Sequence, residues 1–298
     1  MTETSSPSPL LDAGFLQKLE RLALASRKVQ TGVAKGERRS KRKGSSVEFA
    51  DHREYVQGDD LRHIDWNIYG RLDTMYLKLF QEQEDLTLHL VVDGSRSMAF
   101  GTPPKFDFAR KLAAAIGYIG LSGYDRVVGE ILYAERNARL APMRGKASAR
   151  KLFNFFEAAE TAGATDLTAG CKSYTLHNRA KGLTLFISDL FDEAGFEEGL
   201  KQLRSVSPDL FVIQVLAPEE LDPRLTGDLK LIDSETLASA EISVSHALLK
   251  RYAKQRDEFV AGVRDFCHRR GIAHFLVSSD TSVEDLTLHL LRRGGMFQ

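Results

Sequence analysis

The chain has few of the features that mark secreted, membrane-spanning or strongly charged proteins. Its 298 residues include two cysteines, Cys171 and Cys267, and its 41 basic and 41 acidic residues give a formal net charge of zero. Two cysteines in helical patterns provide neither a disulfide framework nor metal-ligand spacing, which favours a reducing compartment. No apolar run approaches the ~18 residues of a membrane span, and the start of the chain lacks the pattern of a signal peptide. We therefore expect a cytoplasmic protein.

Catalytic motifs are also scarce. Neither cysteine has an activating context, Ser188 and Asp189 lack the glycines of a nucleophile elbow, and no glycine-rich phosphate loop with a lysine is present. The zero net charge argues against a globally basic nucleic-acid binder, although it leaves room for local patches. These absences favour a binding module over an enzyme.

The most informative stretch runs from Leu86 to Met98. An apolar run ends there at Asp93, and Ser95 and Ser97 follow at two-residue steps. This pattern predicts a buried strand that ends in a ligand loop, because ligands of open α/β sheets collect outside the carboxyl ends of the strands. Carboxylate and hydroxyl oxygens suit a hard divalent cation. For this motif taken by itself, a turn that caps the next helix is an equal alternative.

Two further loops carry oxygen atoms of the same kind. Thr165 and Asp166 lie in a glycine-containing loop that opens a predicted helix, and a second apolar run, from Leu183 to Ile187, is followed by Asp189. The three loops, in this order, resemble the metal-ion-dependent adhesion site of von Willebrand factor A domains.

The resemblance implies a site for one Mg²⁺ or Mn²⁺. The ligands that it implies are Ser95, Ser97 and Thr165 directly, with Asp93 and Asp189 acting directly or through water. Arg96 stands between the two serines and would either weaken metal binding or pair with an incoming carboxylate. Arg96 and Asp166 are therefore candidates for contact with a partner.

A wider resemblance runs from about Arg38 to the end of the chain. The motifs that carry it stand in one order: an Arg-rich segment with glycine, Glu-Phe at 48–49, Arg-x-Tyr at 53–55, Gly-Asp-Asp-x-Arg at 58–62, Ile-Asp-Trp at 64–66 and Lys-x-Phe at 78–80. They resemble the bacterial family catalogued as domain of unknown function 58, in which this signature precedes a von Willebrand A-like domain. The resemblance implies a MoxR-type AAA+ ATPase as a partner.

The residues before the sheet divide into a polar tip, residues 1–10, and an N-terminal segment, residues 11–81. The segment starts with a predicted helix over 11–25 and continues with a basic arm, whose phosphate-binding candidates are Arg38, Arg39, Lys41, Arg42 and Lys43. No aromatic residues interleave these charges, as single-strand binding would require. A solvated loop or a surface for an acidic partner is the favoured interpretation of the arm.

Residues 47–82 combine many charges with aromatic residues, among them Trp66, the only tryptophan. We expect the charges to pair with one another and Trp66 to be a buried anchor. The neighbouring Asp65 would be held by an arginine, with Arg53, Arg62 and Arg71 as candidates. An exposed aromatic hot spot for a partner is the alternative for Trp66.

From residue 82 to 298, apolar runs and helical patterns alternate. This alternation predicts a doubly wound, mostly parallel α/β sheet with helices on both faces. Strands are expected at 126–133, 138–143, 183–188, 210–216, 229–233 and 272–277, and helices at 105–121, 147–160, 167–177, 196–205, 246–270 and 283–293. The strands at 138–143 and 229–233 are expected at sheet edges.

Taken together, these patterns favour a non-enzymatic adaptor or scaffold. Its bound cation would capture an aspartate or glutamate of a partner protein. A metal-dependent hydrolase that uses the same loops is the first alternative. A phosphate or nucleic-acid binder that uses the basic arm is the second.

Overall fold

The computed structural model describes residues 10–12, 14–20, 47–56, 59–82, 87–178, 182–232 and 239–292. The chain forms two compact units, one of Lys35–Asp85 and the other of Met1–Ala34 together with Leu86–Gln298. Each unit is described by itself below. The basic arm, and the polar tip apart from Leu10, lie outside the described residues.

The larger unit is built on a six-stranded sheet with the order β10-β7-β6-β3-β4-β5. Its strands are β3 (Thr87–Asp93), β4 (Arg126–Leu132), β5 (Ala138–Met143), β6 (Gly182–Ser188), β7 (Asp209–Leu216) and β10 (Ala273–Ser278). Neighbouring strands pair in parallel except β4 and β5, which are antiparallel. The predicted mostly parallel α/β fold, with an antiparallel strand at one edge, is confirmed.

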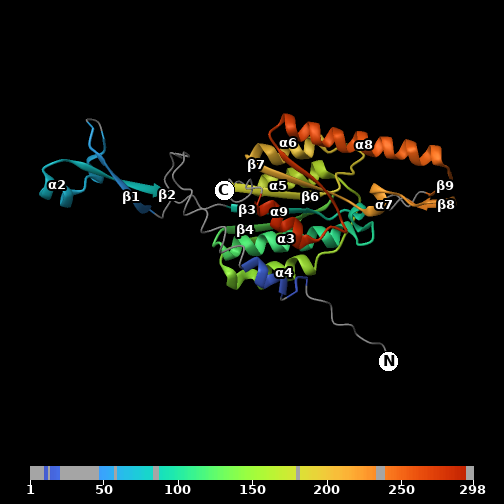
Figure 1. The fold of residues 1–298 in the computed structure, drawn as a ribbon, viewed down its shortest axis with the longest axis horizontal. Coiled ribbons are helices and arrows are strands. Elements are labelled where there is room, and N and C mark those ends of the chain that lie inside the picture. The colour runs from blue at the N-terminus through green and yellow to red at the C-terminus, as the bar shows by residue number, and fades with distance from the viewer. Residues whose placement is uncertain are drawn as a thin grey trace, which may run out of the picture. The chain divides into compact units, whose positions relative to one another are not determined.

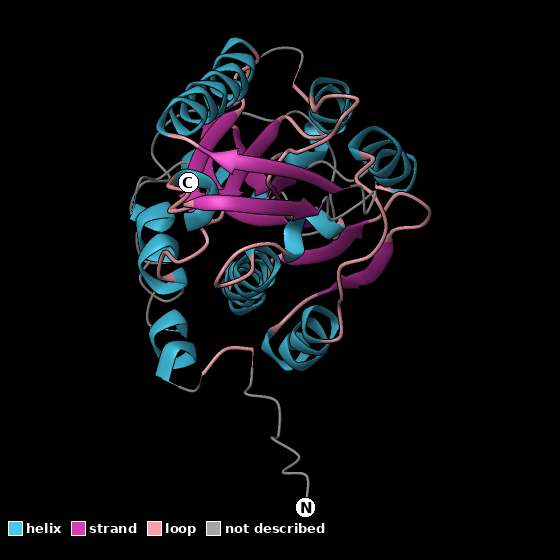
Figure 2. Cartoon of the chain, turned by 90° about the vertical axis from the view of Figure 1, so that its right-hand side faces the viewer, coloured by secondary structure: helices cyan, strands magenta, loops and turns pink. Residues whose placement is uncertain are grey.

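Helices cover both faces of this sheet (Figure 1, Figure 2). They are α3 (Lys105–Ser122), α4 (Ala149–Glu157), α5 (Leu167–His177), α6 (Glu197–Val206), α7 (Pro218–Leu221), α8 (His246–Arg269) and α9 (Val283–Arg292). Strand β3 is buried along its whole length, as its continuous apolar run predicts for a strand covered on both faces. Of the helices that the structure describes, none combines the length and the apolar character that a membrane span requires.

Small residues let α3 lie close to the sheet. Ala113, Ala114 and Ala115 are fully buried, and a Cβ atom at Gly117 would come within 2.7 Å of side-chain carbons of Leu90 and Leu152. The position of α3 matters for function because its first residue, Lys105, reaches the candidate site described below.

A short helix at residues 14–20 belongs to the larger unit. Phe15 and Leu19 are buried in the same apolar core as α3, and Tyr118 on α3 donates a 2.7 Å hydrogen bond to Glu20. The domain boundaries predicted from the sequence assign this helix to an N-terminal segment over 11–81. The structure instead groups it with the sheet and separates Lys35–Asp85.

The segment after α7 differs from the sequence prediction. Strand β8 (Gly227–Ile232) pairs antiparallel with β9 (Ser239–Val244) in a separate two-stranded sheet. The prediction that residues 229–233 form an edge strand of the main sheet is therefore wrong. The short strand satisfies its backbone hydrogen bonds locally because β9 follows it closely in the chain.

The smaller unit is a hairpin of β1 (Val47–Glu54) and β2 (Tyr76–Glu82), with a 3-10 helix (Leu61–His63) and α2 (Trp66–Leu72) between the strands. The expected charge pairing is present, since Arg53 contacts Asp59 at 2.9 Å and Arg62 contacts Asp60 at 2.6 Å.

The expectation that Trp66 is a buried anchor is wrong. Asp65 is buried, and His52 Nε2 lies 3.0 Å from its Oδ2, while its Oδ1 accepts hydrogen bonds from the first turn of α2. Trp66 is 62% exposed, while Ile64 and Leu77 are the buried apolar residues here. A unit this small buries a smaller fraction of its surface than a large domain does.

Replacing Trp66 by alanine is therefore expected to change the free energy of unfolding by less than about 0.5 kcal/mol, the usual range for an exposed site. Ile64→Ala is the matched control in the same unit, and it should cost about 2 to 4 kcal/mol because it truncates a buried side chain. Chemical denaturation of the two variants tests this. A larger loss in Trp66→Ala than in Ile64→Ala would restore the buried-anchor interpretation.

Candidate metal centre

The candidate site lies at the point where the order of the sheet reverses. Strands β3 and β6 are parallel neighbours, but β3 leads through α3 to β4 on one side and β6 leads through α6 to β7 on the other. Open α/β sheets bind ligands in the crevice outside the carboxyl ends of the strands at such a switch point. The residues that follow β3 and β6 are those that the sequence singled out.

Asp93 is buried at the end of β3. Its Oδ1 accepts a 3.0 Å hydrogen bond from the backbone of Ser95, and its Oδ2 accepts one of 2.6 Å from Ser188 Oγ. Burial, together with the charge of Asp189, raises the pKa of Asp93 to about 6. A carboxylate in such surroundings is stabilised by a nearby cation.

The two serines after Asp93 form a pair of oxygen ligands. Ser95 Oγ and Ser97 Oγ lie 3.0 Å apart. An octahedral Mg²⁺ with bonds of ~2.0 to 2.1 Å places adjacent ligands about 2.9 Å from each other. The separation of the two hydroxyls therefore fits two neighbouring positions around one ion.

The loop before α5 packs against the loop after β3. Backbone hydrogen bonds join Ala162 to Gly94 at 2.8 Å and Arg96 to Gly163 at 3.2 Å, which brings the half-buried Thr165 to this edge of the sheet. Asp166 caps α5 by accepting a 2.7 Å hydrogen bond from Ala169. The side chain of Asp166 therefore stabilises the start of α5. Arg96, in the loop after β3, is exposed.

A small cavity of about 10 Å³ lies between these loops. This volume is about that of one water-sized species. The lining residues come from the ends of β3 and β4 and the loop before α5: Asp93, Ser95, Leu132, Tyr133, Ala134, Ala164, Asp166 and Leu167.

Asp189 is paired with a lysine that the sequence analysis did not anticipate. Lys105 Nζ lies 2.7 Å from Asp189 Oδ2 and 2.6 Å from Glu220 Oε1, and the lysine side chain is 0% exposed. The rings of Phe191 and Phe100 lie 4.9 and 5.9 Å from the same ammonium group. Burial lowers the pKa of Lys105, but its two carboxylate partners raise it above the ordinary value.

One signal for Lys105 is present in the sequence. A lysine at the first position of a long helix is unfavourable, because the positive end of the helix dipole lies there. A lysine is tolerated there when carboxylates offset both its own charge and the positive end of the helix dipole. No pattern in the sequence identifies Glu220, which reaches Lys105 from the short helix α7.

The residues present fit a hard divalent cation. Asp93 contacts Ser95, and the charge of Asp189 acts on Asp93, so carboxylate and hydroxyl oxygens, the ligands that such an ion prefers, gather at this edge of the sheet. Among the described residues, no group of three or more His, Cys, Asp or Glu side chains is arranged to hold a metal, so binding here depends on the hydroxyls. Both oxygens of Asp189 already accept hydrogen bonds, from Lys105 and from the backbone of Phe191, which suits a role through water.

A sequence comparison identifies the family. The model of the family described as "Protein of unknown function DUF58" matches residues 51–260, more than half of the chain. The chain belongs to the DUF58 family. The matched range of this DUF58 protein includes most of the smaller unit and the sheet from β3 to β7, so it contains the loops after β3 and β6. The family resemblance predicted from the sequence is confirmed.

Several known proteins are similar to this chain over more than two thirds of its length. Uncharacterized protein Rv1480 of Mycobacterium tuberculosis is 26% identical over 271 residues, which cover 85% of this chain and 84% of the relative. Among solved structures, the conserved hypothetical protein BatB of Bacteroides thetaiotaomicron covers 70% of this chain and 100% of its own, at 14% identity and a TM-score of 0.40. The SpRpn10 VWA domain covers 69% of this chain and 95% of its own, at 10% identity and a TM-score of 0.41.

Proposed function

We propose that this DUF58 protein is a non-enzymatic adaptor that captures a carboxylate side chain of a partner protein through a bound Mg²⁺ or Mn²⁺. The observation that carries the proposal is the pair of serine hydroxyls, 3.0 Å apart, beside a buried carboxylate at the switch point of the sheet. Ser95, Ser97 and Thr165 would hold the ion, with Asp93 and Asp189 in support. The ion would supply a positive centre for an incoming carboxylate.

The surroundings of the loops favour capture over catalysis. Metal-assisted hydrolysis needs a base for the attacking water, and the carboxylates that line the small cavity are Asp93 and Asp166. Asp166 is engaged as the cap of α5. Asp93 and Asp189 are held by hydrogen bonds from Ser188 and Lys105. The role of these two carboxylates is therefore to position the loops and to neutralise the charge of the bound ion.

The rim of the site offers contacts to a protein surface. Phe100 and Phe191 are 48% and 36% exposed, and Arg96 is exposed beside the serines. An arginine can pair with a carboxylate in two-point geometry, so Arg96 would assist capture rather than oppose the metal. The family resemblance suggests a MoxR-type AAA+ ATPase as the protein that works beside this one.

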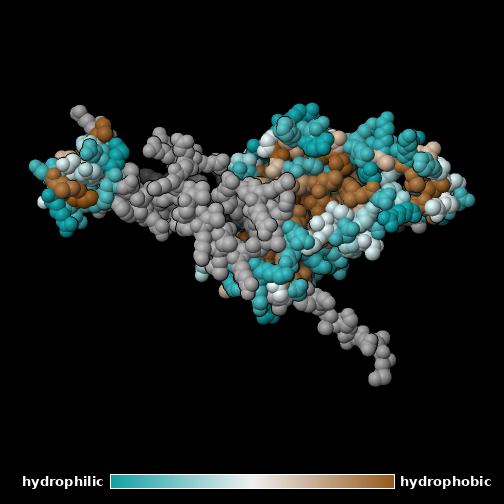
Figure 3. All heavy atoms as spheres, in the orientation of Figure 1, coloured by the Kyte–Doolittle hydropathy of each residue, from teal (hydrophilic) through white to brown (hydrophobic). Residues whose placement is uncertain are grey.

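The smaller unit supplies a second surface for such a partner. Apolar side chains gather on its exterior (Figure 3). The exposed ones are Val56, Leu61, Trp66, Leu72 and Met75. Exposed tryptophan is enriched among residues that dominate binding energy, so Trp66 is the candidate anchor of this surface.

Calorimetric titration with Mg²⁺ and Mn²⁺ tests the metal site. The intact protein is expected to bind one ion, and the Ser95→Ala, Ser97→Ala double variant is expected to lose that binding because it removes two ligands. A double variant with Ser205→Ala and Thr175→Ala is the matched control, since among the described residues these hydroxyls bond to the backbone of their own helices. Equal affinities in the intact protein and the Ser95, Ser97 variant would contradict the proposal.

A further inference from the structure

A second, larger cavity lies between β5 and α5. Its volume is about 680 Å³, within the usual range for small-molecule sites. It is lined by Arg136, Asn137, Ala138, Arg139 and His177, none of which lines the small cavity at the candidate metal centre. Among the described residues that line it, none is acidic.

Contacts with Glu130 and Ser173 fix the orientation of the Arg139 guanidinium. Its Nε lies 3.3 Å from Glu130 Oε1, and its Nη2 donates a 3.1 Å hydrogen bond to Ser173 Oγ on α5. Glu130 is buried and also accepts hydrogen bonds from Asn137 and Asn178. Among the described residues, no acceptor contacts Arg139 Nη1. The arginine is thus oriented in advance, and its outer edge is available for a ligand.

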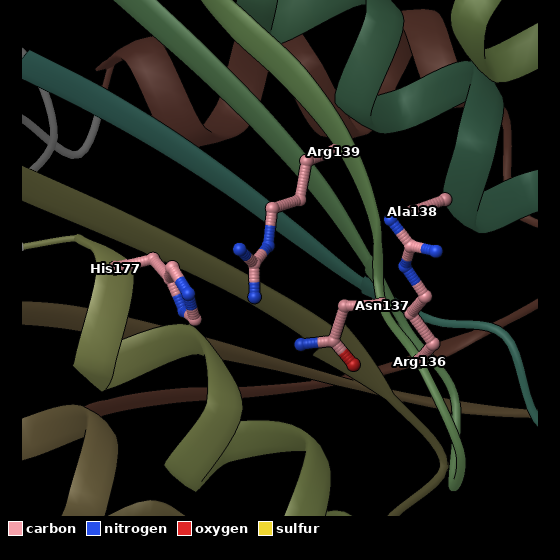
Figure 4. A pocket seen from close by; sticks show the side chains of 5 residues that line it. All are labelled: Arg136, Asn137, Ala138, Arg139 and His177. Carbon is pink, nitrogen blue, oxygen red and sulfur yellow. The ribbon is translucent and has the colours of Figure 1, made fainter.

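His177 approaches from the last turn of α5. Its Nδ1 lies 2.8 Å from the backbone oxygen of Ser173, so Nδ1 donates a hydrogen bond to that oxygen and the ring is held at the end of the helix. In Figure 4 the side chains of Arg139, Asn137 and His177 point toward one another, whereas Arg136 points away from them. Arg139 and His177 are therefore the central groups of the cavity, and Arg136 is a charge at its rim.

The charged side chains that line the cavity are basic, although the protein has no net charge. They are Arg136 and Arg139. The buried Glu130, 3.3 Å from Arg139, offsets one of these charges. Helix α5 contains Lys172 and no acidic residue. An anion that enters the cavity meets an attractive local potential.

We propose that the cavity between β5 and α5 binds a small phosphorylated molecule, with Arg139 and His177 as the phosphate contacts. A planar arginine fork matches phosphate oxygens in two-point geometry. His177 adds a second donor from a different element when both of its ring nitrogens carry protons. The volume exceeds that of a lone phosphate and leaves room for an organic part. This proposal is independent of the candidate metal centre.

Calorimetric titration of the intact protein with glycerol 3-phosphate, inorganic phosphate and glycerol tests the proposal. We expect saturable binding of glycerol 3-phosphate, weaker binding of inorganic phosphate and none of glycerol. Arg139→Gln should weaken binding about tenfold or more, because it removes a charged hydrogen-bond donor. His177→Asn and Arg136→Gln, both at exposed positions, should weaken it less and keep the test informative if Arg139→Gln disturbs Glu130.

Arg126→Gln is the charge-matched control. Arg126 is exposed at the start of β4 and does not line the cavity, so its variant should bind within about twofold of the intact protein, as a distant surface change does. The absence of saturable binding to glycerol 3-phosphate would overturn the proposal. So would an equal loss in Arg126→Gln and His177→Asn, because it would show non-specific attraction.

Discussion

The Lys105→Met variant is expected to be less stable than the intact protein by about 3 to 5 kcal/mol, the range for removing one partner of a buried ion pair. Lys105 is completely buried and faces two carboxylates, Asp189 and Glu220, at 2.7 and 2.6 Å. Without the ammonium group, two carboxylates remain beside each other with little solvent. Burial already raises the pKa of Glu220 above its ordinary value, even though Lys105 opposes the rise.

Urea denaturation of Lys105→Met measures this effect. Lys111→Met is the control, because Lys111 is exposed on the same helix and forms no ion pair with a described residue. The variant Lys105→Met, Asp189→Asn, Glu220→Gln should recover much of the loss, since it removes the three charges together. If Lys105→Met were as stable as Lys111→Met, the ion pairs would not contribute to the fold.

The second large effect is expected at the N-terminal helix. Leu19→Ala should lower the free energy of unfolding by about 2 to 5 kcal/mol, as for other leucines truncated in a core. Leu19 is completely buried with residues of α3 and the sheet. The loss should appear in the unfolding of the larger unit, because the helix at 14–20 shares its core.

Gln17→Ala is the matched control, since Gln17 is exposed on the same helix. Thermal unfolding of both variants, followed by circular dichroism, makes the comparison. A melting temperature in Leu19→Ala equal to that in Gln17→Ala would mean that the helix is an appendage, as the sequence-based domain boundaries imply.

Strong local patterns explain why the sequence predicted most of the sheet. The apolar runs before Asp93 and Asp189 are long and uninterrupted, and strands of this kind are buried on both faces. The bounds predicted for β5 and α5, 138–143 and 167–177, match those observed. Strand β9 was missed because its residues, Ser239–Val244, form no apolar run.

Predictions from the sequence failed for side chains whose burial and contacts depend on tertiary packing. The side chain of Trp66 has the hydrophobic character of an anchor, but in the folded unit Ile64 and Leu77 take the buried positions and Trp66 stays exposed. The contact between Asp65 and His52 was not anticipated, because His52 lies on a strand that the sequence did not indicate.

The sequence by itself determined the family, the strands and most helices of the main sheet, and the edge of that sheet to which Asp93, Ser95, Ser97 and Asp189 belong. These follow from local periodicity and from motif spacing, which the chain carries in each short segment. Only the tertiary structure revealed Lys105 between Asp189 and Glu220 and the basic cavity around Arg139 and His177. Lys105 is 84 positions from Asp189 and 115 from Glu220, and Arg139 and His177 lie on different elements. A local pattern cannot encode a contact that long-range packing creates.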